Sequence, residues 1–271
     1  MPRLSHIAVH PIKALDPVDM ERVTVTDIGG LDGDRAYAIV DETGEYINGK
    51  RTAAVHRLRA DVDLESKRVT LGIRRAEHES RRDTAPEREF HLDADQDAME
   101  AWLSNYFEVP VTLEAGPGGS RTDGVVYGDE TRAGPTVTTE ATLREVASWY
   151  DGIDPTGMRL RLRPNLVIEG TPPFWEDRLL ADDGRRVRVG DVELEGTRPI
   201  SRCVVPTRDP HTGEPCERFR ETFVERRAAT LPAWTDRELL DDNLYSLTVG
   251  THIPDAERDG ELRVGSEVEL L

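Results

Sequence analysis

The sequence is poor in lysine and cysteine, and it lacks any long apolar run. Its basic residues include three lysines only (Lys13, Lys50 and Lys67), and its two cysteines are too few for a disulfide framework. No stretch approaches the roughly 20 apolar residues that a membrane-spanning helix requires. The first residues also lack the apolar core of a secretory signal. These absences predict a cytoplasmic protein without a membrane span.

The charge balance is strongly acidic. Lysine and arginine total 35 against 53 aspartates and glutamates, which gives a net charge of -18. This surplus repels phosphate backbones and anionic lipid, so we expect no nucleic-acid partner. An acidic, lysine-poor surface also suits high salt, where screening relieves the self-repulsion. We therefore predict a halophilic protein, with an ordinary acidic mesophilic protein as the alternative.

Short alternating runs predict a protein that is mainly β with a few helices, in the α+β class. Apolar and polar residues alternate over residues 4–12, 20–28 and 35–44, with the glycine-rich turn GGLDGD before the third run. Residues 61–73 read as a hairpin. Strands of this length and spacing are typical of an antiparallel barrel or sandwich.

Three segments with helical periodicity interrupt the strands. The first opens at Asp93 and carries an apolar stripe. The second begins at about Thr142, with Glu145 completing a capping box. The third covers residues 217–229. The stripe of the first helix consists of Met99, Trp102, Leu103 and Tyr106.

Composition divides the chain into two domains. Residues 1–115 form a smaller β-rich N-terminal domain, in which the charged, aperiodic stretch 74–89 is a surface loop. Residues 116–135 are rich in glycine, proline and serine and read as a linker or an active-site loop. Residues 136–271 form the second domain.

Both cysteines lie in the stretch ISRCVVPTRDPHTGEPC, and the residues alone leave several roles open. Structural zinc requires more clustered ligands than Cys203, Cys216 and His211 provide. A disulfide is disfavoured in a reducing cell, and an inert buried cysteine is the simplest alternative. A nucleophilic pair of Cys203 with His211 or His252 is another. Arg202 favours the thiolate of its neighbour Cys203, and a thiolate is a soft ligand for a transition metal.

The run SRCVVPTRDPHTG resembles the cysteine motif of MOSC-domain proteins, the family of the molybdenum cofactor sulfurase C-terminal domain. The stretches RPNLVIEG, FWED, VGDVEL and the closing GELRVGSEVELL, which is similar to the family's final hairpin, follow the family's order. HPIKAL and GLDGDRAYAIVDETG resemble the β-barrel domain that precedes MOSC in amidoxime-reducing proteins. The resemblance implies a β-barrel MOSC domain after a smaller β-rich domain.

The resemblance also implies a site. Cys203 takes the role of the thiolate that binds molybdenum beside a pterin dithiolene. Asp209 is either the first residue of a turn before Pro210 or a catalytic acid. Ala14 and Ile200 depart from the family, which often has a small polar residue and a second cysteine there. The residues implied to hold the molybdenum cofactor are Lys13, Arg35, Thr139, Thr142, Arg163, Asn165, Ser201 and Arg202.

The expected function is reduction of small N-hydroxylated compounds, such as hydroxylamines, amidoximes and N-hydroxylated bases, by a molybdenum-cofactor-dependent oxidoreductase. Two cysteines cannot hold an iron–sulfur cluster, so a separate ferredoxin, flavoprotein or cytochrome must supply electrons. The alternative is a carrier of the cofactor, or of sulfur bound to Cys203. Cys216 has no counterpart in the motif and is expected to be structural.

Overall fold

An eight-stranded sheet dominates the computed structural model, which describes residues 1–74, 87–116, 134–180 and 185–271. Its strand order is β15–β11–β12–β13–β9–β10–β1–β2. β9 and β10 are parallel, and the other neighbours are antiparallel. In sheet order the strands are Val268–Leu270, Arg186–Val189, Val192–Ser201, Ser246–His252, Thr136–Thr139, Leu166–Glu169, Arg3–Val9 and Val18–Met20.

The large sheet curls back on itself. Arg3, at the start of β1, forms an isolated bridge with Glu267, one residue before β15. Leu4 N also donates a hydrogen bond to Ser266 O at 2.9 Å. A core of Leu, Ile and Val fills the concave side. Among the described residues these contacts do not amount to a closed ring of strand ladders.

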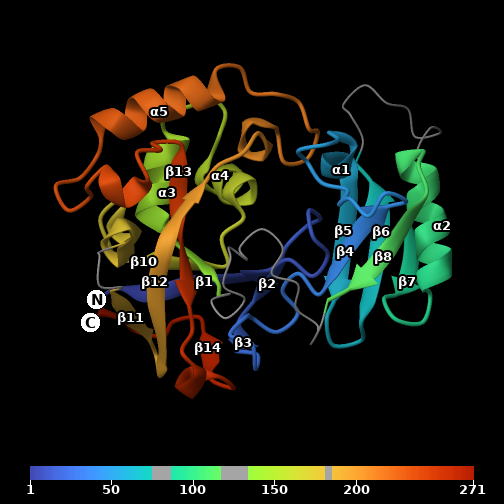
Figure 1. Cartoon of the computed structure of the whole chain (residues 1–271), viewed down its shortest axis with the longest axis horizontal. Helices are drawn as coiled ribbons and strands as arrows, with labels where there is room; N and C mark the ends of the chain where they lie inside the picture. The colour runs from blue at the N-terminus through green and yellow to red at the C-terminus, as the bar shows by residue number, and fades with distance from the viewer. Residues whose placement is uncertain (75–86, 117–133, 181–184) are drawn as a thin grey trace.

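Two smaller sheets form an N-terminal lobe, defined here as β4 to β8 with α1 and α2 (Figure 1). β4 (Tyr37–Asp41) pairs with β8 (Val111–Ala115). The second sheet contains β5 (Leu58–Asp63), β6 (Arg68–Ile73) and β7 (Arg88–His91). The core of the N-terminal lobe includes buried side chains from both sheets and from α2 (Gln96–Phe107). The short helix α1 (Ala54–Arg57) lies at the end of this lobe that faces the rest of the molecule.

Three helices pack on the large sheet: α3 (Glu140–Ala147), α4 (Pro155–Leu162) and α5 (Phe219–Ala229) (Figure 1). Their apolar side chains form a third core with Tyr245 and Leu247, which flank or lie in β13. Strand β3 (Arg22–Thr24) pairs with β14 (Glu261–Arg263) at the base. Short 3-10 helices complete the fold: η2 (Trp175–Leu180), η3 (Val205–Thr207), η4 (Glu238–Leu240) and η5 (Asp255–Glu257).

The β-rich class with a few helices is confirmed, as are the hairpin of β5 and β6 and the helix α5. Some details were predicted wrongly. The first predicted helix, α2, begins at Gln96 and not at Asp93. The closing segment is not a hairpin, because β14 pairs with β3 while β15 pairs with β11. Helix α4 was not predicted, although Asp154 caps it and Pro155 occupies its first turn.

The predicted capping box is also wrong. Helix α3 begins at Glu140, and its cap is Thr139, whose hydroxyl accepts a hydrogen bond from Thr142 N at 3.1 Å. Glu145 instead accepts a hydrogen bond from Trp149 Nε1 at 3.1 Å. A threonine three residues upstream competes for the same role, and the backbone conformation decides between them.

Two predicted features, the charged loop 74–89 and the glycine-rich segment 116–135, lie largely outside the described residues. Within the described ranges, no helix is both long and apolar enough to cross a bilayer.

Candidate functional site

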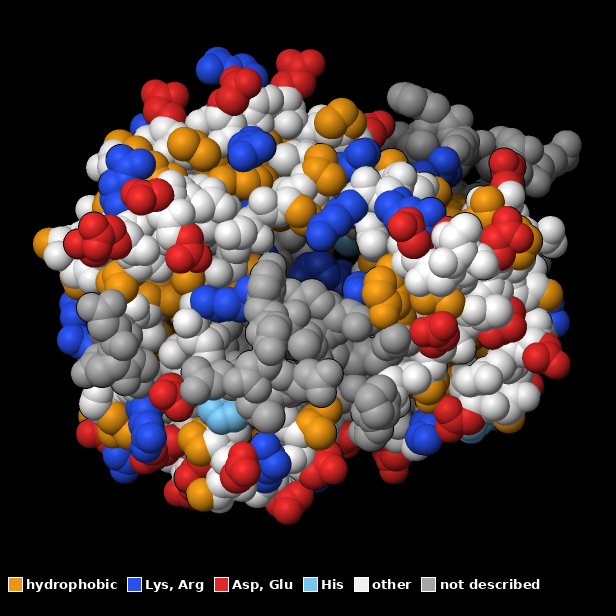
Figure 2. Space-filling model, viewed as in Figure 1, with side chains coloured by type: hydrophobic (Ala, Val, Ile, Leu, Met, Phe, Trp, Pro, Cys, Tyr) orange, Lys and Arg blue, Asp and Glu red, His pale blue; other side chains and the backbone are white. Residues whose placement is uncertain are grey.

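A cavity of about 410 Å³ lies between the N-terminal lobe and the large sheet (Figure 2). Its lining is cationic, although the whole chain carries a net charge of -18. Of the described residues that line it, Asp16 is the one acidic side chain. The lysines and arginines of the lining are Lys13, Arg35, Lys50, Arg74, Arg161, Arg163, Arg202 and Arg208.

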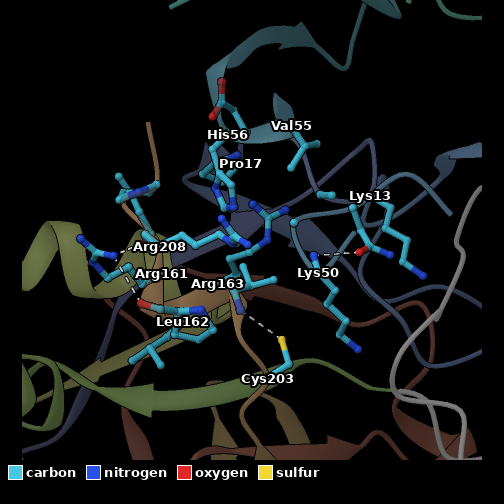
Figure 3. A pocket seen from close by; sticks show the side chains of 18 of the residues that line it. Lys13, Pro17, Lys50, Val55, His56, Arg161, Leu162, Arg163, Cys203 and Arg208 are labelled. Carbon is cyan, nitrogen blue, oxygen red and sulfur yellow. Dashed lines mark hydrogen bonds between the residues drawn. The ribbon is translucent and has the colours of Figure 1, made fainter. Parts of the chain in front are cut away.

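Cys203 forms part of the cavity wall (Figure 3). It follows the end of β12 and precedes the short helix η3, so a turn presents its side chain. Its Sγ atom accepts a weak hydrogen bond from Val205 N at 3.5 Å, and its carbonyl accepts one from Tyr245 Oη at 3.3 Å. The thiol is partly buried and not disulfide-bonded, so it is available to a ligand.

Arg202 fixes this turn. Its guanidinium donates hydrogen bonds to the carbonyls of Leu247 (2.9 Å from Nε) and Leu162 (3.0 Å) and to Thr248 Oγ1. Burial lowers the pKa of Arg202 to about 10, although Cys203 opposes the shift. The arginine thus ties the Cys203 turn to β13 and to the end of α4. Arg202 lines the cavity, but its guanidinium donates these hydrogen bonds to acceptors within the protein.

Arg163 and Arg35 meet in the cavity with few carboxylates around them. Burial, and then the charge of Arg35, lower the pKa of Arg163 to about 10. The Arg163 guanidinium donates no hydrogen bond to a described residue and forms no ion pair with one, although it lines the cavity. Both residues hold left-handed backbone, with φ of 55° at Arg163 and 53° at Arg35. At Arg163 this conformation ends α4, as is common at helix C-termini.

Asn165 supports Arg35 from behind and is only 1 % exposed. Its Oδ1 accepts hydrogen bonds from Thr136 N at 3.1 Å and from Arg35 Nη1 at 3.4 Å, and its Nδ2 donates to Ala8 O at 3.0 Å. Asp34 pairs with Arg35 on the other side. Asn165 therefore joins β1, β9 and Arg35, and it is not itself part of the cavity lining.

Lys13 and Ser201 both line the cavity. The Nζ atom of Lys13 lies 3.7 Å from the ring centroid of Tyr46, a cation–π contact that holds the side chain in place. Ser201 is exposed, and its hydroxyl accepts a hydrogen bond from Asn243 Nδ2 at 3.0 Å. Two of the three lysines in the chain, Lys13 and Lys50, thus belong to this one cavity.

Asp209 has the geometry of a turn residue. Its Oδ1 accepts hydrogen bonds from His211 N and Thr212 N, both at 2.9 Å. Its Oδ2 lies 3.5 Å from Arg161 Nη2. Both oxygens are engaged, and Asp209 is not part of the lining. The catalytic role stays a prediction, whereas the geometry matches the turn alternative.

Thr139 and Thr142 lie elsewhere, around the buried carboxylate of Glu176. Glu176 is 0 % exposed and accepts hydrogen bonds from Thr142 Oγ1 at 2.8 Å and from Thr139 Oγ1 at 3.3 Å. Burial and the charge of Asp177 raise the pKa of Glu176 to about 7. The two threonines do not line the cavity, so the structure does not bring them together with Cys203.

Several residues that line the cavity were not predicted from the sequence. Arg161 and Arg208 reach the cavity from α4 and from the turn after η3, and His56 reaches it from α1. The Nε2 atom of His56 and the Nε atoms of both arginines are buried with no hydrogen-bond partner among the described residues. His56 has its pKa lowered by burial and by Arg208 and Arg163. For Lys50, which also lines the cavity, the sequence did offer a signal, because lysine is rare in this chain.

The arrangement is suited to an anionic ligand with many acceptors, held beside a cysteine. In the parts of the chain that the structure describes, no group of three or more His, Cys, Asp or Glu side chains gathers as a metal site.

Comparison with known families finds two matches. The model of the MOSC N-terminal beta barrel domain matches residues 1–110, and that of the MOSC domain matches residues 137–269. MOSC domains are linked to proteins that bind the molybdenum cofactor. No curated protein matches the chain.

Proposed function

The chain belongs to the MOSC domain family and carries that family's N-terminal β-barrel domain, and from this we propose that it is a molybdenum-cofactor-dependent reductase of N-hydroxylated compounds. One observation carries the proposal. Cys203 lies on the wall of a cationic cavity in a protein whose net charge is -18. A soft thiolate and a set of guanidinium donors are what a metal bound to a phosphorylated pterin requires.

The residues present fit this cofactor. Arg163 lines the cavity without an ion pair to a described side chain, and the buried Nε of Arg161 and Nε2 of His56 lack hydrogen bonds within the same set. Unsatisfied buried donors are costly, and a ligand with phosphate and ring acceptors would satisfy them. Cys203 would hold the metal, while Lys13, Arg35 and Arg163 would hold the anionic part. Arg202, Asn165 and Asp34 would keep these groups in position.

When bound, the cofactor would supply a metal that accepts electrons and removes oxygen from the substrate. The net reaction converts an N–OH group, two electrons and two protons into an N–H group and water. The electrons would come from a separate donor protein, a ferredoxin, flavoprotein or cytochrome. A reducing cytoplasm, the location we propose, would keep Cys203 as the free thiol that it is here.

The first test is metal content. The protein would be made in a host that synthesises the cofactor, and molybdenum and pterin would be measured per chain. We expect stoichiometric loading in the wild type and its loss in Cys203→Ala. Cys216→Ala is the matched control, because this second partly buried cysteine does not line the cavity. Equal loading of Cys203→Ala and wild type would contradict the metal-ligand role.

The second test is turnover. Loaded protein with an artificial electron donor should reduce a hydroxylamine or an amidoxime, and the Cys203→Ala protein should not. Stoichiometric loading without any such reduction would instead favour the alternative, a carrier of the cofactor or of sulfur.

A further inference from the structure

The cavity holds more unpaired positive charge than a cofactor phosphate alone requires. Three of its arginines have carboxylate partners: Arg35 pairs with Asp34, Arg74 with Asp16, and Arg161 with Asp209. Arg202 is taken up by the backbone carbonyls and the hydroxyl described above. Arg163, Arg208 and Lys50 remain without a carboxylate partner in the described portion of the chain.

These three cations differ in their surroundings. Arg163 is partly buried and lies beside Arg35, and burial and the charge of Arg35 lower its pKa. Lys50 is exposed and has no hydrogen bond from its ammonium group to any described residue. Arg208 is intermediate, and its side chain donates one long hydrogen bond, to Gly213 O at 3.3 Å. Figure 3 shows Lys50 and Arg208 on either side of Arg163.

Lys50 and Arg208 line the same cavity as Cys203, so a small molecule bound beside the thiol lies in the electrostatic field of both cations. Low-dielectric walls lined by one sign of charge raise the local concentration of oppositely charged ligands. On a chain with a net charge of -18, this cationic lining is a local site of attraction for anions.

We propose that the substrates are anionic, namely N-hydroxylated compounds that also carry a carboxylate or a phosphate, and that Lys50 and Arg208 bind this second group. The inference rests on the proposed function, since it assigns a substrate class to that site. His211, which also lines the cavity from the exposed turn after Arg208, adds a third donor to the same cavity.

Binding without turnover tests this proposal. Loaded protein, with no electron donor present, would be titrated calorimetrically with benzamidoxime and with its 4-carboxylate, at one fixed KCl concentration at which the wild type is folded. We expect the carboxylate to bind about 10-fold more tightly. Equal affinities for the two compounds would overturn the proposal.

Substitution locates the effect. Lys50→Gln should reduce the preference for the carboxylate about 3-fold, as expected for one exposed charge, and Arg208→Gln should reduce it further. Lys67→Gln is the matched control. This lysine is exposed, its Nζ lies 2.8 Å from Asp93 Oδ2, and it does not line the cavity. Lys50 is exposed, so its variant remains informative even if Arg208→Gln fails to fold. A preference that survives both substitutions would contradict the assignment.

The outcomes separate this inference from the proposed function. Preferential binding of the carboxylate without reduction of either compound would contradict the reductase and support the anion site. Reduction of both compounds with equal KM would support the reductase and overturn the anion site. If Lys50→Gln slows turnover only when a protein donor supplies the electrons, Lys50 binds that donor, and the substrate assignment is wrong.

Discussion

The molecule holds two clusters of charged and polar side chains, and their charge balance differs. In the first, here called the threonine–carboxylate cluster, every carboxylate named has protein donors: Glu176 binds three threonines, and Asp177 binds Arg227 and Thr235. In the cavity, by contrast, cations outnumber carboxylates and several nitrogens have no partner among the described residues. Arg227 also has two buried nitrogens, Nε and Nη1, without a partner among the described residues, so the difference lies in the charge balance. Carboxylates paired with protein donors stabilise a fold, whereas surplus cations at a cavity are suited to an anionic ligand. The members of the first cluster are Thr138, Thr139, Thr142, Glu176, Asp177, Arg227 and Thr235.

The largest effect should come from breaking the ion pair in the threonine–carboxylate cluster. Arg227→Met leaves the carboxylate of Asp177 buried without its cation, which typically costs about 3–5 kcal/mol. Urea unfolding monitored by circular dichroism would measure the loss. The exposed neighbour Arg226→Met is the control and should change the free energy of unfolding by less than about 0.5 kcal/mol. A similar small change in both variants would mean that the cluster does not stabilise the fold.

The matching experiment in the cavity is Arg163→Met. Because burial lowers the pKa of this arginine, its charge is less favourable in the folded protein than in the unfolded chain. Removing it should therefore leave the free energy of unfolding unchanged or slightly higher. Cofactor occupancy, measured as molybdenum per chain, should fall at least about 10-fold, as expected for a lost charge-assisted contact. Destabilisation as large as that of Arg227→Met would remove the distinction between the two clusters.

Glu176 tests the threonine–carboxylate cluster by pH. Its pKa is raised to about 7 in the fold, above its value of 4.5 in the unfolded chain. Between these values the folded state binds a proton that the unfolded state has released, so stability falls as pH rises through this window, by up to about 1.4 kcal/mol per unit. Glu176→Gln cannot titrate and should lose this slope. Unfolding midpoints would be measured between pH 4.5 and 8 for the wild type and Glu176→Gln. Parallel dependence of the midpoint on pH in the two proteins would contradict the raised pKa of Glu176.

Salt should have opposite effects on the acidic exterior and on the cationic cavity. Screening relieves repulsion on the acidic exterior, so molar KCl should raise Tm by roughly 2–4 °C for each kcal/mol gained. The same screening should weaken the binding of anions in the cationic cavity. Thermal melts and anion titrations over one KCl series would test both halves. A Tm that does not rise with KCl would contradict the predicted adaptation to salt.

Residues next to one another in the chain were the easier part to predict. Alternation located most strands, and the motif around Cys203 located the wall of the cavity. The sequence could not show which distant residues meet at the cavity. His56 and Arg208 are 152 positions apart, and only the packing of the N-terminal lobe against the rest of the molecule brings them to one cavity. Likewise, nothing local distinguishes Thr139, which caps a helix over Glu176, from a threonine that faces a ligand.

The smallest predicted effect concerns backbone strain at the cavity. Ala14, beside Lys13, has a φ of 72°, a left-handed conformation that costs a residue with a Cβ about 1–2 kcal/mol and glycine very little. Ala14→Gly should therefore raise the free energy of unfolding by less than about 1 kcal/mol, because the added flexibility of the unfolded chain offsets part of the relief. Ala228→Gly, at an exposed position in α5, should lower it by about 1 kcal/mol. Opposite signs in denaturant titrations would show that strain is stored on the cavity side. If both variants lose stability equally, the Ala14 turn is unstrained, and the left-handed residues around the cavity give no support to its functional role.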